Sequence, residues 1–377
     1  MKVCYFGTYR KEYARNKLMI AAMERAGIEV KQCHVKLWHG IQDRVDSIEG
    51  GWKKPDFWWR VVKAYVLLIW RFKKVGDFDI LMVGYPGQFD VFLAKIFAIL
   101  KGKPLVWDVL MSIYLVACER GLSINNKFII NFISWIEGKS LRLPDLLIQD
   151  TQEYVNWFNK NYGISTDRFR LIPIGADDRV FYPVSKQKND EHDKFIILYY
   201  GTFIPNHNVS VIVKAANILR NRTEICFKLI GDGPDKVFAE NYVKKHELSN
   251  VSFVGWMAQE DLRNQIANAD ICLGVFGNTT QSLMTVHNKI IECLAMEKPI
   301  ITGDSTAVRN AFSKDTVFLC NRDDPQSLAD AILSIKSDPI KQQTLSKNAL
   351  IIFQKSYSIS RTSEIIQIYL SKLIRKS

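Results

Sequence analysis

The chain has 377 residues, which is more than one compact core usually accommodates and indicates two domains. Hydrophobic residues make up 47% and charged residues 24%, a balance typical of a globular protein rather than a disordered one. The seven scattered cysteines form no C-x-x-C pair and suggest neither a zinc site nor a disulfide framework, so we expect buried thiols, a reducing compartment and no metal.

The sequence shows no signal for export or membrane insertion. Its amino-terminal run, KVCYFG, is strand-like and lacks the apolar core of a secretory leader. No apolar stretch reaches the roughly 18 to 20 residues that would span a bilayer. We therefore expect a cytoplasmic protein that does not cross the membrane.

Basic residues and tryptophans gather in residues 52–74, where seven Lys or Arg and four Trp accompany one acid, Asp56. This composition is typical of a peripheral contact with the anionic inner face of a membrane. A solvated helix whose aromatic face packs inward explains it equally well. Nucleic acid is a weaker third reading, and because no recognition motif supports it, we expect no nucleic-acid partner.

Strand and helix patterns alternate along the chain, which predicts α/β domains with parallel sheets and crossover helices. In the first half we expect a helix over 15–26, ended by Gly27, and a linker rich in Asp, Lys, Asn and Pro over 176–194. The expected strands are 2–7, 28–33, 78–84, 103–109, 145–150 and 168–175.

A second α/β pattern begins after the linker. The expected strands are 195–201, 225–233, 251–255, 271–276 and 299–302, and the expected helices lie near 208–221, 259–268, 287–297 and 358–374. The domains are thus predicted as 1–175, 195–355 and a closing helix in 356–377. Two doubly wound Rossmann-like sheets of this kind are expected to bind ligands at the carboxyl ends of their strands, facing a cleft.

Glycines follow two of the second-half strands. Gly201 with Thr202, and Gly231-Asp232-Gly233, stand where small residues let backbone N–H groups approach a phosphate. Each is weak evidence alone, because any turn from strand to helix favours glycine.

The segment from Thr279 to Thr302 carries the most chemistry. His287, Asn288 and Lys289 fall in the first turn of a predicted helix, where unpaired N–H groups and a cation suit a diphosphate. Glu292 follows on a neighbouring face and has the chemistry to accept hydrogen bonds from two ribose hydroxyls. A solvated helix carboxylate is the alternative for Glu292.

Five motifs in this order resemble the retaining glycosyltransferases of the GT-B fold, family 4, also called glycosyltransferase group 1. They are LLIQDTQEYVNWFNKNYGISTDRFRLIPIGADDRVFYP, LYYGTFIPNHNVSVIVKAANIL, FKLIGDGP, VSFVGWMAQEDL and HNKIIECLAMEKPIITGD. The match covers nearly the whole chain and is densest over 145–305. It implies that the first domain binds the acceptor, that the second binds the donor, and that SYSISRTSEIIQIYL is a final helix crossing back to the first domain.

Three positions depart from the family pattern. The family commonly has a glutamate eight positions before the one matching Glu292, where this chain has Met284. It also often has an Arg and a Lys at positions that are Thr202 and Asn208 here, so His207 or Lys289 would have to supply charge for the diphosphate.

The resemblance implies transfer of a sugar from a nucleoside diphosphate sugar to a glycan or lipid-linked acceptor, with retention of configuration and without a metal or cofactor. The implied catalytic residues are Lys289, Glu292 and Asp108, and the acceptor contacts in the loop after the first strand are Tyr9, Arg10, Arg15 and Asn16. The implied donor-binding residues are Gly201, Thr202, His207, Asn208, Gly231, Asp232, Gly233, Gly255, Trp256, Leu262, Met284, His287 and Asn288.

Other functions stay open at this point. A nucleotide-sugar-binding scaffold that has lost turnover would explain the three departures, and a GT-B-like sugar-nucleotide epimerase would share the architecture. A dinucleotide oxidoreductase is disfavoured, because the first strand is followed by GTYRKEY rather than G-x-G-x-x-G.

Overall fold

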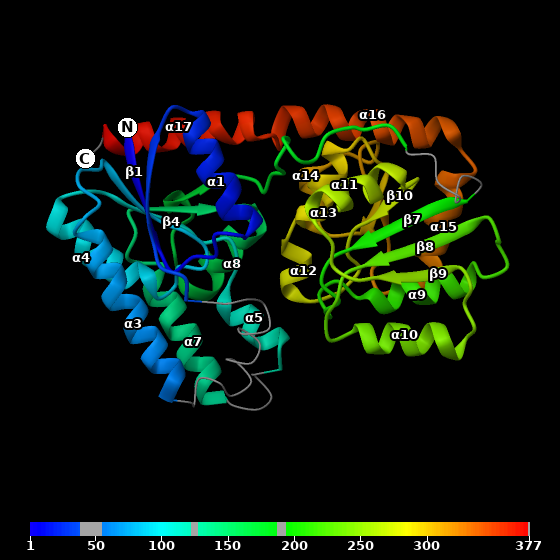
Figure 1. Cartoon of the computed structure of the whole chain (residues 1–377), viewed down its shortest axis with the longest axis horizontal. Coiled ribbons are helices and arrows are strands. Elements are labelled where there is room, and N and C mark those ends of the chain that lie inside the picture. Colours follow the sequence, from blue (N-terminus) through cyan, green and yellow to red (C-terminus); the bar gives the residue numbers. More distant parts are fainter. Residues whose placement is uncertain (38–54, 122–126, 187–193, 376–377) are drawn as a thin grey trace. The chain divides into compact units, whose positions relative to one another are not determined.

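The computed structural model describes residues 1–37, 55–121, 127–186 and 194–375. The chain divides into two compact units: unit 1 comprises Met1–Pro173 with Thr362–Ser377, and unit 2 comprises Ile174–Arg361. Each unit contains one six-stranded sheet, and all the strand pairings are parallel (Figure 1). The predicted pair of doubly wound α/β sheets is therefore confirmed.

Parts of two predicted segments lie outside the described residues. These are 187–193 of the predicted linker and 52–54 of the basic, Trp-rich segment. Within the described ranges, no helix combines the length and apolarity needed to cross a bilayer.

The sheet of unit 1 has the strand order β2-β1-β3-β4-β5-β6. Its strands are β1 Lys2–Gly7, β2 Glu29–His34, β3 Ile80–Val83, β4 Leu105–Asp108, β5 Leu146–Gln149 and β6 Phe169–Leu171. β1, β3, β4 and β5 are buried almost throughout, and this run of Val, Ile, Leu and aromatic residues is what a sheet covered on both faces requires.

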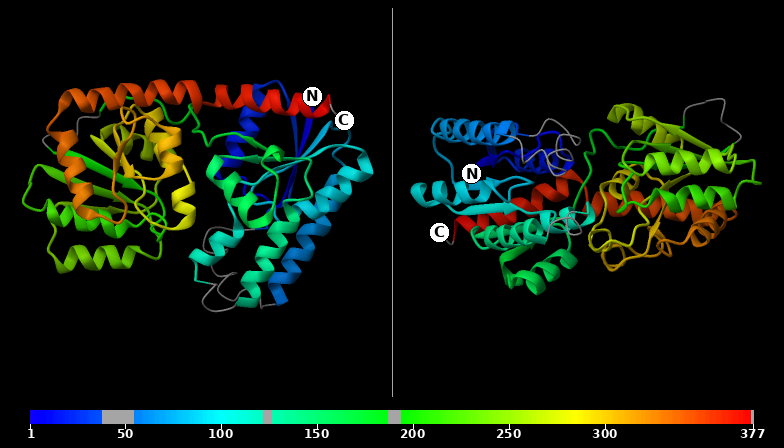
Figure 2. Two further views of the ribbon diagram at one scale, coloured as in Figure 1. Left: turned by 180° about the vertical axis from the view of Figure 1, so that it is seen from behind. Right: turned by 90° about the horizontal axis from the view of Figure 1, so that it is seen from below.

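The crossover helices of unit 1 fall on two faces because the chain reverses direction across the sheet. The helices are α1 Ala14–Arg25, α3 Pro55–Phe72, α4 Asp90–Lys101, α5 Ile113–Glu119, α7 Lys127–Ser140, α8 Gln152–Tyr162 and α17 Ile359–Ile374. The step from β1 to β2 runs one way and places α1 on one face. The steps from β2 to β3, β4 and β5 run the other way and place α3, α4 and α7 together on the opposite face (Figures 1 and 2).

The last helix, α17, contributes to the core of unit 1. Ile366 and Leu370 are completely buried in one cluster with Met19 and Met23 of α1 and with side chains of the sheet. The Tyr369 hydroxyl also donates a hydrogen bond to the carbonyl of Leu171 (3.4 Å). The helix thus packs on the same face as α1, although 198 positions separate Tyr369 from its partner in sequence.

The sheet of unit 2 has the strand order β12-β11-β10-β7-β8-β9. Its strands are β7 Phe195–Tyr200, β8 Ile225–Ile230, β9 Val251–Val254, β10 Ile271–Leu273, β11 Ile300–Gly303 and β12 Phe318–Cys320. Its helices are α9 Val209–Ile218, α10 Lys236–Lys245, α11 Gln259–Asn268, α12 Thr280–Met284, α13 Asn288–Ala295, α14 Thr306–Ala311, α15 Pro325–Lys336 and α16 Pro339–Ser356. The strand order reverses between β7 and β10, and such a switch point is where open α/β sheets bind ligands.

The strand predicted over 168–175 is shorter in the structure and ends at Leu171. The next two carbonyls, of Ile172 and Pro173, accept hydrogen bonds from the Arg15 guanidinium at 2.9 and 3.0 Å. Pro173 also has no N–H to offer a neighbouring strand. The buried Arg15 guanidinium therefore satisfies the backbone carbonyls just beyond the end of β6, where strand pairing stops.

We predict that Leu370→Ala destabilises unit 1 by about 2 to 5 kcal/mol, since it removes a fully buried side chain and leaves a cavity. Ile368→Ala is the matched control, because Ile368 is on the same helix and 50% exposed. Hydrogen exchange followed by mass spectrometry should show faster exchange in β1 and β3 for Leu370→Ala alone. Equal exchange in the two variants would contradict the assignment of α17 to this core.

Candidate functional site

The loops after β7 and β10 meet at the switch point of unit 2. A Cβ added to Gly277, in the loop after β10, would lie 2.4 Å from the carbonyl oxygens of Pro205 and Asn206. The Ser282 hydroxyl donates to the same Asn206 carbonyl (3.0 Å). Glycine is thus required at 277 for the two loops to touch.

The glycines after β7 and β8 also pack against one another. Gly201 and Gly231 have φ angles of +138° and +133°, a region that favours glycine. A Cβ on Gly231 would lie 2.0 Å from the Gly201 carbonyl oxygen, and one on Gly233 would lie 2.5 Å from that of Phe203. The predicted glycines therefore bring two backbone turns into contact at the carboxyl end of the sheet.

Lys289 reaches back from the first turn of α13 to this junction. A Cβ on Gly201 would lie 2.9 Å from the Lys289 Nζ, so the ammonium occupies the space beside that glycine. Nζ also lies 4.0 Å from the centre of the Tyr199 ring, a cation–π contact. Burial lowers the pKa of Lys289 to about 7, against the opposing effect of Cys293 and Glu292.

His207 borders the same ammonium. Its Nδ1 lies 2.6 Å from the Thr202 carbonyl oxygen and 3.4 Å from the Lys289 Nζ. A carbonyl can only accept, so Nδ1 carries the proton and the Lys289 contact is not a hydrogen bond to it. Burial, followed by the charge of Lys289, lowers the pKa of His207 well below its ordinary value, and the ring is neutral at pH 7.

Tyr200, the last residue of β7, holds the Glu292 carboxylate by a hydrogen bond. The Tyr200 hydroxyl donates to the Glu292 Oε2 (2.8 Å) and lies 3.2 Å from the Lys289 carbonyl oxygen. Burial raises the pKa of Glu292, while the bond from Tyr200 and the charge of Lys289 act in the other direction. One tyrosine thus fixes the carboxylate and touches the backbone of the lysine turn.

His287 stands at the N-cap position of α13 in an extended conformation. Its Nε2 lies 3.1 Å from the Asn206 Oδ1, and burial lowers the pKa of His287 well below its ordinary value. Since the amide oxygen accepts, Nε2 is the protonated nitrogen and the ring is neutral. His287 therefore joins the N-terminus of α13 to the loop after β7 without adding charge.

Arg322 braces the loop that carries Ser282. Its Nε donates to the Asp304 carbonyl (2.6 Å), and its Nη1 donates to the Gly277 carbonyl and to the Ser282 Oγ (2.9 Å). Burial lowers the pKa of Arg322 to about 10. Sequence reasoning missed this residue, because nothing in its local sequence links it to a loop 40 positions away.

Several residues predicted for the same site have other contacts. The Asn208 Nδ2 donates to the Asp323 Oδ1 (2.9 Å), and its Oδ1 accepts from Ser210 (2.6 Å). Met284 is buried at the end of α12, and the exposed Asp232 accepts from the N–H of Gly233. Further along, Gly255 and the exposed Trp256 follow β9, and Leu262 is half-buried in α11. Their roles stay predictions.

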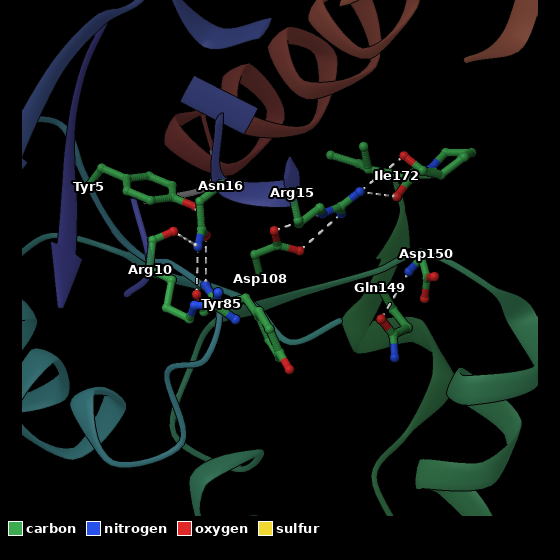
Figure 3. A network of polar contacts seen from close by, with 10 residues as sticks. Tyr5, Arg10, Arg15, Asn16, Tyr85, Asp108, Gln149, Asp150 and Ile172 are labelled. Carbon is green, nitrogen blue, oxygen red and sulfur yellow. Dashed lines mark hydrogen bonds and ion pairs between the residues drawn. The ribbon is translucent and has the colours of Figure 1, made fainter. Parts of the chain in front are cut away.

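Unit 1 has its own buried polar cluster at the carboxyl ends of its strands (Figure 3). Arg15 and Asp108 are both completely buried and form a two-pronged ion pair, with Nε to Oδ2 at 2.8 Å and Nη2 to Oδ1 at 3.0 Å. The remaining guanidinium nitrogen, Nη1, donates to the carbonyls of Ile172 and Pro173. The two predicted site residues thus bind each other, and Arg15 also binds the backbone just after β6. Neither is open to a second molecule in this conformation.

Asn16 is likewise used within unit 1. Its Nδ2 donates to the carbonyls of Arg10 and Tyr85 (2.9 and 2.6 Å), and its Oδ1 accepts from the Tyr5 hydroxyl and the Tyr85 N–H (2.9 and 3.0 Å). Tyr9 is buried and donates to Gln32 (3.2 Å). Of the four residues predicted to meet an acceptor, Arg10 is the one left partly exposed.

Asp150 is a buried carboxyl that the sequence analysis treated only as the end of a strand. It is 7% exposed, and its Oδ1 has no hydrogen-bond partner in the structure. Burial raises the pKa of Asp150 to about 7, with Arg15 opposing and Asp108 reinforcing the effect. Its nearness to Arg15 across the sheet gave no sequence signal, because the two residues are far apart in the chain. Within the described ranges, no group of three or more His, Cys, Asp or Glu has the arrangement of a metal site.

Comparisons with known proteins show which proteins this chain is similar to. Residues 194–338 match the family model described as glycosyl transferases group 1. The chain is 22% identical over 273 residues to an alpha-D-kanosaminyltransferase of Streptomyces kanamyceticus, covering 70% of this chain and 69% of that protein. It is 24% identical over 196 residues to an uncharacterized glycosyltransferase of Methanocaldococcus jannaschii, covering 51% of this chain and 50% of that protein.

Two solved structures show the fold. Sucrose-phosphate synthase from Thermosynechococcus elongatus superposes with a TM-score of 0.77 at 16% identity, covering 100% of both chains. Anabaena HepE, in complex with UDP-glucose, superposes with a TM-score of 0.72 at 15% identity, covering 99% of this chain and 100% of that one. The expected GT-B architecture is confirmed.

We predict that Asp150→Asn flattens the pH dependence of stability between about pH 4 and pH 7. The pKa of Asp150 is higher in the folded state than its ordinary value of 3.8, so the folded state binds the proton more tightly. Wild-type stability therefore falls as pH rises through this window, by up to a few kcal/mol for this group. The asparagine variant loses that part of the fall.

Chemical denaturation at pH 4.5, 6 and 7.5 measures the effect. Asp90 and Glu137 also have raised pKa values, of about 6 and 7, so the informative quantity is the difference between wild type and variant at each pH. Asp56→Asn, at an exposed position, is the control. Parallel curves for wild type and Asp150→Asn would contradict the prediction.

Proposed function

Because residues 194–338 match the glycosyl transferases group 1 family model, we propose that this chain transfers a sugar from a nucleoside diphosphate sugar to a glycan or lipid-linked acceptor, with retention of configuration. The GT-B fold alone does not decide this, since one fold hosts many activities. The observation that carries the proposal is the position of Lys289. Its ammonium is buried beside Gly201, at the N-terminus of α13 and at the switch point of the sheet.

The site suits a diphosphate for three physical reasons. The first turn of α13 offers unpaired N–H groups and a partial positive charge. Gly201 has no Cβ, so the Lys289 Nζ lies directly beside its turn and adds a second source of positive charge. Lys289 has a pKa near neutrality because it is desolvated, and an anion beside it would favour the charged form.

Glu292 is proposed to accept hydrogen bonds from the ribose hydroxyls. The bond from Tyr200 leaves Oε1 and the second lone pair of Oε2 for this purpose. Because UDP and UDP-glucose are the ligands held by the Anabaena HepE structures, UDP-sugars are the first donors to test.

The proposed reaction is a substitution at the anomeric carbon. The bond from that carbon to the diphosphate oxygen breaks, the acceptor oxygen bonds to the carbon on the same face, and the acceptor proton passes to the leaving phosphate. Lys289 and the N-terminus of α13 stabilise the charge that develops on the phosphate. We propose that this removes the need for a metal or cofactor.

The finer parts of the proposal concern the acceptor and its location. A lipid-linked acceptor, cell-surface polysaccharide or glycoconjugate synthesis, a cytoplasmic site of action and contact of residues 52–74 with an anionic membrane form one consistent set. Their support is the composition of that segment, of which Trp52, Lys53 and Lys54 lie outside the described residues. The predicted contact of Arg10 with an acceptor remains part of this proposal, whereas Asp108 is completely buried in its ion pair with Arg15 and is not assigned a catalytic role.

Replacing Lys289 by Ala should remove transfer and weaken donor binding by at least tenfold, because the one buried cation of the described α13 turn is lost. A thermal-shift screen of UDP-, GDP- and ADP-sugars first identifies the donor. Transfer is then measured with that donor, with and without EDTA, which should have no effect. Lys244→Ala, at an exposed site on α10, is the control. Full donor binding and transfer by Lys289→Ala would reject the assigned site.

The variant Tyr200→Phe tests the role of Glu292. It removes the hydroxyl that holds the Glu292 Oε2 while keeping the ring in the core. We expect the KM for the donor to rise about tenfold with a smaller change in kcat, since one hydrogen bond to a charged group contributes about 1.5 to 3 kcal/mol. Glu292→Gln should show the same pattern. An unchanged KM in both variants would separate Glu292 from donor recognition.

A non-catalytic nucleotide-sugar-binding protein is the second candidate. Asn208 favours it, because it replaces a family lysine and its side chain is bonded to Asp323 rather than presented to a ligand. Met284 and Thr202 stand at the other two departures. Donor binding without hydrolysis or transfer to any glycan or lipid acceptor would identify this alternative.

A further inference from the structure

The helix layer formed by α3, α4 and α7 in unit 1 is apolar on both sides. Its inner side buries aliphatic and aromatic residues against the sheet, among them Leu68, Phe72, Ala94 and Ile130. Its outer side should be polar if water covered it, since a surface helix normally has one apolar stripe. The exposed residues show the opposite.

Fifteen large hydrophobic residues lie exposed on these three helices, including the N-cap of α4. They are Trp58, Trp59, Val62, Val66, Leu67, Ile69, Trp70, Phe89, Phe92, Ile96, Ile99, Leu100, Phe128, Phe132 and Trp135. We call this set the outer face. Among the described residues the whole chain exposes 25 such side chains, so most of them gather on one layer.

The most exposed members come from all three helices: Trp59 is 72%, Leu100 74% and Phe128 81% exposed. The helices lie side by side in every view (Figures 1 and 2), and the rings of Phe72 and Phe97 stack between α3 and α4 at 4.0 Å. Exposed apolar side chains gathered on three neighbouring helices mark an interaction site rather than ordinary scatter. It also excludes the reading in which the aromatic face of residues 52–74 packs inward, as far as the described part of that segment goes.

The outer face has a strongly basic border. Seven exposed cations lie on or directly after the three helices: Lys63, Arg71, Lys73, Lys74, Lys101, Lys127 and Lys139. The described acids of these helices are Asp56, which is exposed, and Asp90 and Glu137, which are buried. The exposed charges on or directly after the three helices are thus seven cations and one carboxylate.

Two of the cations stand directly beside tryptophans of the outer face. The Lys74 Nζ lies 3.5 Å from the Trp70 ring centre, and the Lys139 Nζ lies 5.9 Å from that of Trp135. Paired in this way, the indole suits the depth of lipid headgroups and the ammonium suits their phosphates.

We propose that the outer face of α3, α4 and α7 seats the protein in the interfacial region of an anionic lipid bilayer. The inference rests on the membrane contact proposed for residues 52–74 and extends it to two further helices, but it does not depend on sugar transfer. The charge favours lipid over a second copy of the chain. A symmetric dimer through this face would bring two sets of seven cations together with one exposed acid each.

Flotation of the full chain with vesicles tests the proposal. Wild type should float with vesicles of phosphatidylcholine and phosphatidylglycerol, and at least tenfold less with phosphatidylcholine alone, since each cation near the surface adds about 1 kcal/mol. The triple variant Trp59→Ser, Leu100→Ser, Phe128→Ser should lose binding at least tenfold. All three positions are exposed, so the fold should be kept.

Two further variants separate the causes. The control is Val237→Ser, Ile340→Ser, Ile351→Ser, at comparably exposed apolar sites in unit 2, and it should float like wild type. The charge variant Lys73→Gln, Lys74→Gln, Lys101→Gln should lose the preference for anionic vesicles. Quenching of tryptophan fluorescence by brominated lipids should occur in wild type and decrease in Trp59→Ser.

The outcomes that overturn the proposal are distinct from failure of the donor site. Equal flotation of wild type and the serine triple variant rejects the outer face. A wild-type dimer that becomes a monomer in this variant, with no vesicle binding, assigns the face to a second copy instead. Thermal shift with sugar nucleotides should match wild type for the serine triple variant and the charge variant, because none of their altered residues lies in unit 2.

Discussion

The proposed donor site depends on keeping one ammonium group out of water. Desolvation is the main cause of the lowered pKa of Lys289, and it costs stability in the free protein. The ammonium fits because Gly201 has no Cβ and because the Tyr199 ring offers a π face at 4.0 Å. The neutral rings of His207 and His287 add no competing charge. A desolvated cation interacts strongly with an incoming anion, since little water must be removed on binding.

The location of this site could be predicted from the sequence, but many side-chain partners could not. Alternating strands and helices give parallel sheets, and glycines at strand ends give turns that approach a ligand. These rules concern local sequence and place Gly201, Gly231 and Lys289 near one another. They say nothing about Asn208, whose partner Asp323 is 115 positions away. They also miss Tyr200, which reads as an ordinary strand residue and yet holds Glu292.

Unit 1 shows why polar residues at strand ends are ambiguous. Arg15 and Asn16 follow the first strand, where a ligand contact is a reasonable prediction. The structure uses them instead to satisfy backbone groups where the sheet ends, since buried carbonyls need donors. Asp108 neutralises the buried guanidinium, which would otherwise be too costly to bury. Asp150 Oδ1 and the neighbouring Gln149 Nε2 are among the buried polar atoms that this arrangement leaves without a partner in the described part of the chain.

The outer face of α3, α4 and α7 could not be predicted from the sequence for a different reason. A helix that is apolar all round reads as a buried core helix, and α4 has that composition. Topology decides otherwise, because a helix in the outermost layer of an α/β unit has a sheet on one side only. The other side must then meet something besides water. Hydrophobic burial alone is compatible with either a protein or a lipid partner for the outer face. The basic border favours a partner with an anionic surface.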